Sequence, residues 1–164
     1  RRLSSAASDV YKRQAKKQIL GVYDKDLVKS FAAVAKNLSM EHVLIVHGFD
    51  GLDEITITNK TYVAELKDNS INEYEISPKD FGLNFGQLSE IIAQSSDDSL
   101  QLIREAFSGE KSAVQDMIAL NSGAALYLAK VVHSIADGVE LSFELMNNGM
   151  AADKLASYVR VSNS

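Results

Sequence analysis

The sequence contains no cysteine and no tryptophan, and Pro78 is its single proline. The absence of cysteine excludes disulfide bonds and thiolate metal sites, and it fits a reducing compartment. No apolar run approaches the roughly 20 residues that a helix needs to cross a membrane, so we expect a soluble, cytoplasmic protein with no membrane partner. Basic residues are fewer than acidic ones, 17 against 22, and the net charge of −5 argues against nucleic acid as a partner.

The basic residues are unevenly distributed along the chain. Residues 1–17 contain six of them and a single acidic residue. Within this stretch, residues 1–14 show neither the period of a helix nor that of a strand. We therefore expect residues 1–14 to be a non-native or disordered leader that takes no part in the fold.

The most informative segment is an apolar run followed by an acidic loop. The run from Val43 to Val46 predicts a strand that is buried on both faces, as in parallel sheets. The strand should end at His47, and the loop after it carries Asp50, Asp53 and Glu54. Ligands of open α/β sheets bind just outside the carboxyl ends of the strands, which is where this loop is expected.

The neighbouring carboxylates Asp53 and Glu54 suggest what such a ligand is. They repel each other unless a cation or a basic group lies between them. Mg²⁺ takes one or two carboxylates and leaves its other positions to water and substrate phosphates. The residues themselves therefore indicate a loop that handles phosphate.

The remaining pattern predicts an α/β arrangement in the first half of the chain. Asp24 should cap a helix whose apolar positions run from Leu27 to Leu38. The β-branched runs 55–58 and 62–66 predict two strands joined by a hairpin at 59–61, and 71–76 predicts a third antiparallel strand.

From about Gln87 the pattern becomes helical. One helix should start at Ser95 or Ser96, and a central buried helix is predicted over 112–132, because its residues are apolar nearly all round. Its small-sided segment 121–125 is expected to pack against another backbone. Two amphipathic helices are predicted over 134–147 and 150–159.

Residues 46–54, Val-His-Gly-Phe-Asp-Gly-Leu-Asp-Glu, resemble a motif of the anthranilate phosphoribosyltransferase family. Further segments resemble that family in order and spacing from about Ala15 to about Val159. Residues 18–24 are similar to the start of a family helix. The other matching segments are 61–65, 77–83, 107–110 and 121–127.

The resemblance implies a fold class and a domain organisation. Residues 15–160 would be the C-terminal part of an α/β nucleoside phosphorylase/phosphoribosyltransferase catalytic domain, and residues 161–164 a tail. This partial domain would have one or more parallel strands and an antiparallel patch, followed by a helical C-terminal region. The resemblance stops at about residue 14, where the family has a Gly-Pro-x-x-Asn-Pro type segment. A transit peptide shares the composition of residues 1–14 but would precede a whole enzyme, so a foreign leader fits better.

The resemblance also implies a site and a reaction. In that family the Asp-Glu pair helps to hold a Mg²⁺ ion that accompanies the pyrophosphate of the sugar donor, which makes Asp53 and Glu54 the expected metal ligands and Mg²⁺ the expected cofactor. The implied reaction joins anthranilate to phosphoribosyl pyrophosphate in tryptophan biosynthesis. The family's Gly-Thr-Gly-Gly-Asp and Lys-His-Gly-Asn segments do not occur in this sequence, and its helical domain does not either. We therefore expect an inactive fragment of a homodimeric glycosyltransferase, with no catalytic residue and no substrate-binding residue assigned.

Other functions and roles stay open on the sequence alone. A pyrimidine nucleoside phosphorylase would share the architecture, and a non-catalytic metal- or phosphate-binding α/β module would explain the missing phosphate loop. Asp50, which precedes Gly51, is expected to close a turn with its own backbone. His47 is expected to be structural, with phosphate contact or loop orientation as alternatives. His42 and His133 belong to no constellation of chemical groups.

Overall fold

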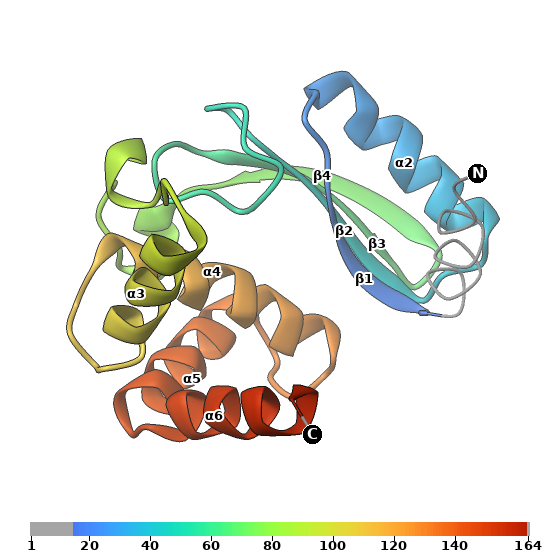
Figure 1. The fold of residues 1–164 in the computed structure, drawn as a ribbon. Helices are drawn as coiled ribbons and strands as arrows, with labels where there is room; N and C mark the ends of the chain where they lie inside the picture. The colour runs from blue at the N-terminus through green and yellow to red at the C-terminus, as the bar shows by residue number, and fades with distance from the viewer. Residues whose placement is uncertain (1–14, 164) are drawn as a thin grey trace, which may run out of the picture. The chain divides into compact units, whose positions relative to one another are not determined.

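The computed structural model describes residues 15–163, and Figure 1 shows their helices and strands. The leader expected at residues 1–14 lies outside the described residues. The described residues form two compact units. The first comprises residues 15–55 and Lys60–Ile76, and the second comprises Thr56–Asn59 and residues 77–163. None of the described helices is long and apolar enough to cross a membrane.

Within the described residues, the first unit consists of a four-stranded sheet and helix α2. The strand order is β1-β2-β3-β4, with β1 and β2 parallel and the two remaining pairs antiparallel, so the expected mixture of pairings is confirmed. Its elements are β1 (Lys17–Gly21), α2 (Lys25–Asn37), β2 (His42–Gly48), β3 (Thr61–Lys67) and β4 (Ser70–Ile76).

Strand β2 is the centre of this unit. All seven of its residues are buried, which confirms the strand predicted from the apolar run. On one face, α2 packs its buried residues Val28, Ala32 and Ala35 against Val43 and Ile45. On the other face, Leu44 and Val46 are also fully buried. A strand that loses water on both faces needs a continuous apolar run, and that is why the run could be recognised.

The start of α2 confirms one prediction and corrects another. Asp24 caps the helix and accepts a hydrogen bond from Asp26 N at 2.9 Å. The interpretation of residues 18–24 as the start of a helix is wrong for residues 18–21, which belong to β1. Part of the expected apolar stripe also stays outside the core, since Phe31 and Leu38 remain 43% and 49% exposed.

The strand predicted at 55–58 and its hairpin at 59–61 are wrong. These four residues form no strand, and the hairpin that joins β3 to β4 lies at Asp68 and Asn69. Thr56 gives the physical reason, because its hydroxyl accepts a hydrogen bond from the Thr58 amide at 3.0 Å and so takes a donor that a strand would need. The third predicted strand is confirmed as β4.

The second unit is helical, as predicted for the later half of the chain. Its central pair of helices meets at two glycines, where a Cβ on Gly123 would lie 2.6 Å from Val139 N and a Cβ on Gly138 would overlap Gly123. The expectation that segment 121–125 packs against another backbone is therefore confirmed. The elements are η1 (Pro78–Phe81), η2 (Leu88–Glu90), α3 (Ser96–Ala106), α4 (Ala113–Leu128), α5 (Ile135–Asn147) and α6 (Met150–Ser162).

A buried carboxyl group lies in the first turn of α4. Asp116 is 8% exposed, and within residues 15–163 its Oδ1 atom has no hydrogen-bond partner. Burial raises the pKa of Asp116 above its ordinary value of 3.8, and the positive charge of Lys111 offsets part of that rise. Ionisation of Asp116 therefore opposes folding.

The sign of this effect can be measured. Because the folded pKa of Asp116 is above the unfolded one, its contribution is most favourable below the unfolded pKa and is lost as the pH rises through the folded pKa. We expect Asp116→Asn to raise the free energy of unfolding at pH 7 relative to the unsubstituted chain, and this gain to shrink towards pH 4. Urea titrations at both values measure it. Asp153→Asn, at an exposed position of α6, serves as the control and should not show this pattern.

Candidate carboxylate loop

The loop after β2 is closed by its own hydrogen bonds. Gly48 N donates to Leu52 O and Gly51 N donates to Gly48 O, both at 2.8 Å. The Asp50 carboxylate accepts from Leu52 N at 3.1 Å, which confirms the expected turn-closing role of Asp50. Gly51 has a φ of +94°, a backbone conformation that side chains with a Cβ disfavour. We call residues Gly48–Glu54 the carboxylate loop.

The carboxylate loop lies at the carboxyl end of β1 as well as that of β2. A Cβ placed on Gly21, the last residue of β1, would overlap the carbonyl oxygen of Asp53, so the two backbones are in direct contact. His47 adds a second link, because its Nδ1–H donates to Val22 O at 2.9 Å. That bond fixes the tautomer of His47 and ties the end of β2 to the chain that follows β1. The loop therefore occupies the edge where open α/β sheets bind ligands.

The pair predicted as metal ligands sits at the end of this loop. Asp53 and Glu54 are exposed, and in the part of the chain that the structure describes neither carboxylate forms a hydrogen bond or an ion pair. Their hard oxygen atoms suit Mg²⁺. The described residues contain no group of three or more histidines, cysteines or acids that could hold a metal ion. The pair fits a Mg²⁺ coordination shell whose other positions are filled by water and phosphate oxygens rather than by protein groups.

Two aromatic rings and a lysine lie at the start of the loop. Lys25 Nζ is 4.7 Å from the ring centroid of Phe49 and 4.5 Å from that of Tyr62, so the ammonium group contacts both rings. The Tyr62 hydroxyl donates to Glu73, whose carboxylate also pairs with Lys29 Nζ at 3.1 Å. The Tyr62 hydrogen bond lowers the pKa of Glu73 and raises that of Tyr62, while Glu73 raises the pKa of Lys29.

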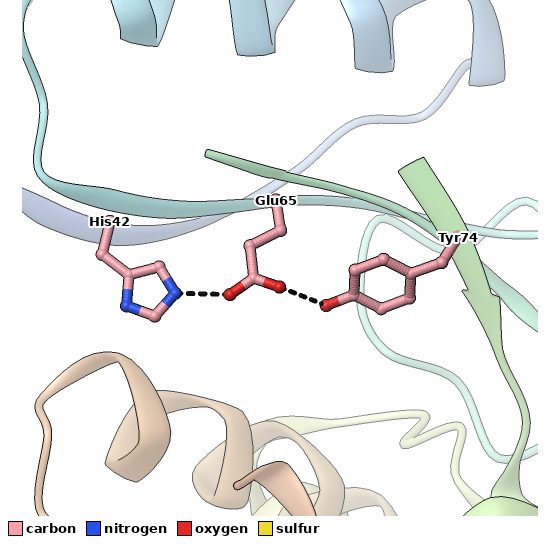
Figure 2. Close-up of polar contacts among 3 residues, drawn as sticks. All are labelled: His42, Glu65 and Tyr74. Carbon is pink, nitrogen blue, oxygen red and sulfur yellow. Dashed lines mark hydrogen bonds and ion pairs between the residues drawn. The ribbon is translucent and has the colours of Figure 1, made fainter. Parts of the chain in front are cut away.

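A second polar cluster involves the other end of β2 and is shown in Figure 2. His42 Nε2 lies 2.6 Å from Glu65 Oε1, and the Tyr74 hydroxyl donates to Glu65 Oε2 at 2.9 Å. His42 is 2% and Glu65 9% exposed. The sequence alone predicts no partner for His42 and no role for Glu65 or Tyr74. An acidic residue within the apolar run of β3 was the only available signal.

Glu65 should be much more important for stability than an exposed glutamate of the neighbouring strand. Glu65→Ala would remove the acceptor of the buried His42 and of the part-buried Tyr74, and we expect it to lower the free energy of unfolding by about 3 kcal/mol. Glu75→Ala removes the exposed pair with Lys60 at 3.0 Å and should cost less than about 1 kcal/mol. Urea unfolding at pH 7 compares the two variants. Equal losses would show that the cluster in Figure 2 adds little.

Comparison with known proteins shows which family the sequence matches. The sequence profile described as "Glycosyl transferase family, a/b domain" matches residues 11–152. The anthranilate phosphoribosyltransferase of Vesicomyosocius okutanii subsp. Calyptogena okutanii (strain HA) is 45% identical over 145 residues, which are 88% of this chain and 43% of that protein.

Solved structures give the same result for the fold. Anthranilate phosphoribosyltransferase from Saccharomyces cerevisiae in complex with PRPP and Mg has a TM-score of 0.78 at 26% identity, over 90% of this chain and 43% of that chain. The complex of the same enzyme with 4-fluoroanthranilate has a TM-score of 0.79 at 25% identity, over 90% and 44%. The chain thus spans less than half the length of these relatives.

These matches confirm the resemblance seen in the motif and the expected fold class, that of the nucleoside phosphorylases and phosphoribosyltransferases. They cover both units, from β1 in the first to the start of α6 in the second. The chain belongs to the glycosyl transferase family whose a/b domain the profile describes.

Proposed function

We propose that this chain is the C-terminal part of a Mg²⁺-dependent anthranilate phosphoribosyltransferase, and that Asp53 and Glu54 are its metal ligands. The observation that carries the proposal is the position of the carboxylate loop. It presents two exposed acids at the carboxyl ends of two parallel strands. The relatives of this chain include a protein named anthranilate phosphoribosyltransferase. A related structure was obtained with PRPP and Mg, which supports both the sugar donor and the metal.

The chemistry that this loop would serve is departure of pyrophosphate. When bound, Mg²⁺ neutralises the negative charge that gathers on the leaving group. Asp53 and Glu54 would supply hard oxygens to the ion, and the turn closed by Asp50 holds these residues at the sheet edge. His47 is bound to the backbone of Val22, so we assign it a structural role. No residue of the chain is assigned as a general acid or base.

Two alternative functions can be distinguished from the proposed one. The relatives named above are anthranilate phosphoribosyltransferases, which supports the transferase over a pyrimidine nucleoside phosphorylase. A non-catalytic metal-binding module is tested by the upstream reading frame of the source DNA, which should encode a glycine-rich phosphate loop if the enzyme reading is right. The homodimer and the cytoplasmic location rest on the resemblance and stay predictions.

Removing both carboxylates tests the metal assignment. In the full-length protein, replacing Asp53 and Glu54 with alanine should lower kcat by on the order of a hundredfold, because the metal acts mainly as charge builds on pyrophosphate. KM for anthranilate should change little, since interactions made mainly in the transition state appear in kcat. Steady-state kinetics across a Mg²⁺ titration measure both effects.

The matched control removes two acids elsewhere. Glu140 and Glu144 are exposed on α5, and their double replacement with alanine changes the net charge by the same amount. This control should keep its kcat and its Mg²⁺ dependence. If the Asp53/Glu54 variant behaves like the control, the pair is an ordinary solvated turn.

The 164-residue chain alone should catalyse no phosphoribosyl transfer. Its sequence contains no Gly-Thr-Gly-Gly-Asp type phosphate loop, and it spans less than half of its relatives. The loss of anthranilate fluorescence in the presence of the sugar donor and Mg²⁺ measures turnover. Activity above background would show that the catalytic groups lie within these residues.

A further inference from the structure

We propose that Lys25 is a positioning residue for the carboxylate loop, acting through the rings of Phe49 and Tyr62. The ammonium group contacts both rings, at 4.7 Å and 4.5 Å from their centroids, and so joins the loop to β3. The role of the loop in metal binding rests on the proposed function, whereas the contact itself rests on the geometry. Lys25 belongs to neither the acidic motif nor the hydrophobic core.

The Tyr62 side of this contact is fixed by the sheet. Tyr62 lies in β3 opposite His47, the residue that ties the end of β2 to Val22. Its hydroxyl is bound to Glu73 on β4, and Glu73 is paired with Lys29 on α2. Lys25 and Lys29 are four residues apart and share one face of α2. The Tyr62 ring is therefore an anchor that three elements of the first unit hold in place.

The Phe49 side of the contact belongs to the loop. Phe49 N donates to Lys60 O at 2.9 Å, and the ring is 40% exposed. Hydrogen bonds from Gly48 to Leu52 and from Leu52 to Asp50 make the residues after Phe49 one closed turn. A restraint on the Phe49 ring therefore restrains the whole turn that ends in the two metal-binding carboxylates.

The position of Lys25 in α2 supports a role for its contacts with the two rings. It is the first residue of α2, where a positive charge is unfavourable to the helix dipole. Within residues 15–163 it forms no ion pair, so the two ring faces are its principal contacts. Helix stability alone would favour another residue at this position. The contact with the loop gives lysine a role there.

The test follows metal binding and loop motion separately in the 164-residue chain. Mn²⁺ alone is added to the ¹⁵N-labelled chain, and paramagnetic broadening of the amides of residues 51–54 gives a dissociation constant. Hydrogen exchange of the Gly48 and Leu52 amides, which are hydrogen-bonded within the loop, is measured without metal. We compare Lys25→Met, Lys25→Arg, Phe49→Leu and the control Lys36→Met, which removes one charge at the other end of α2.

A positioning role and a purely electrostatic role of Lys25 predict opposite changes in Mn²⁺ affinity for Lys25→Met. Removing a positive charge near a cation site should tighten Mn²⁺ binding if Lys25 acts only through its charge. If Lys25 positions the loop, Lys25→Met should weaken Mn²⁺ binding about fivefold and speed exchange of both amides, with an unchanged urea midpoint. Phe49→Leu should do the same. Arginine keeps the ring contacts and should restore binding, and Lys36→Met should leave it unchanged.

Each outcome decides between the two ideas. Unchanged or tighter Mn²⁺ binding in Lys25→Met, with unchanged exchange, would overturn the positioning role while leaving the metal site intact. No broadening at residues 51–54 in the unsubstituted chain would show that the two carboxylates do not hold the ion without donor phosphates, and would overturn the role of Lys25 in metal binding by the chain alone. The exchange rates of Gly48 and Leu52 would then still decide whether Lys25 holds the loop.

Discussion

The contact between Gly21 and Asp53 is the constraint on which the site depends. The backbone at the end of β1 lies directly against the Asp53 carbonyl, and a side chain at position 21 would occupy the same space. This contact forms only because β1 and β2 are parallel and in register, with Gly21 opposite Val46. The position of the carboxylates is therefore set by strand pairing, before any ligand or charged partner is present.

The polar residues at the two ends of strand β2 make that pairing reliable. The apolar residues of β2 are buried on both faces of the sheet. A shift of one residue would exchange the side chains of one face with those of the other, and all of them would stay buried. The apolar pattern alone therefore does not fix the register. The polar ends of the strand supply what the apolar run lacks. His47 bonds to Val22 O at one end, and His42 bonds to Glu65 at the other. These directional bonds complement the non-directional burial of the middle of the strand.

The sequence predicted the parts of this arrangement that local chemistry decides. The burial of β2, the Asp24 cap, the Asp50 turn and the later helices all follow from neighbouring residues. Strand β1 was missed because its five residues are mixed in polarity and become a strand by pairing with β2. The contacts of Glu65 with His42 and Tyr74, and of Lys25 with two rings, join distant positions and depend on strand register. Nothing in the local pattern specifies them.

The exposure of Asp53 and Glu54 has a consequence for how a metal would bind under the proposed function. Two adjacent carboxylates that belong to no larger ligand cluster among residues 15–163 repel each other and fill only part of the shell of Mg²⁺. If the phosphates of the sugar donor fill the rest, each ligand raises the affinity of the loop for the other by the same factor. A loop held by backbone contacts and ring faces suits this coupling. It keeps the carboxylates at the sheet edge in the absence of metal, so that metal and donor need only complete the site rather than build it.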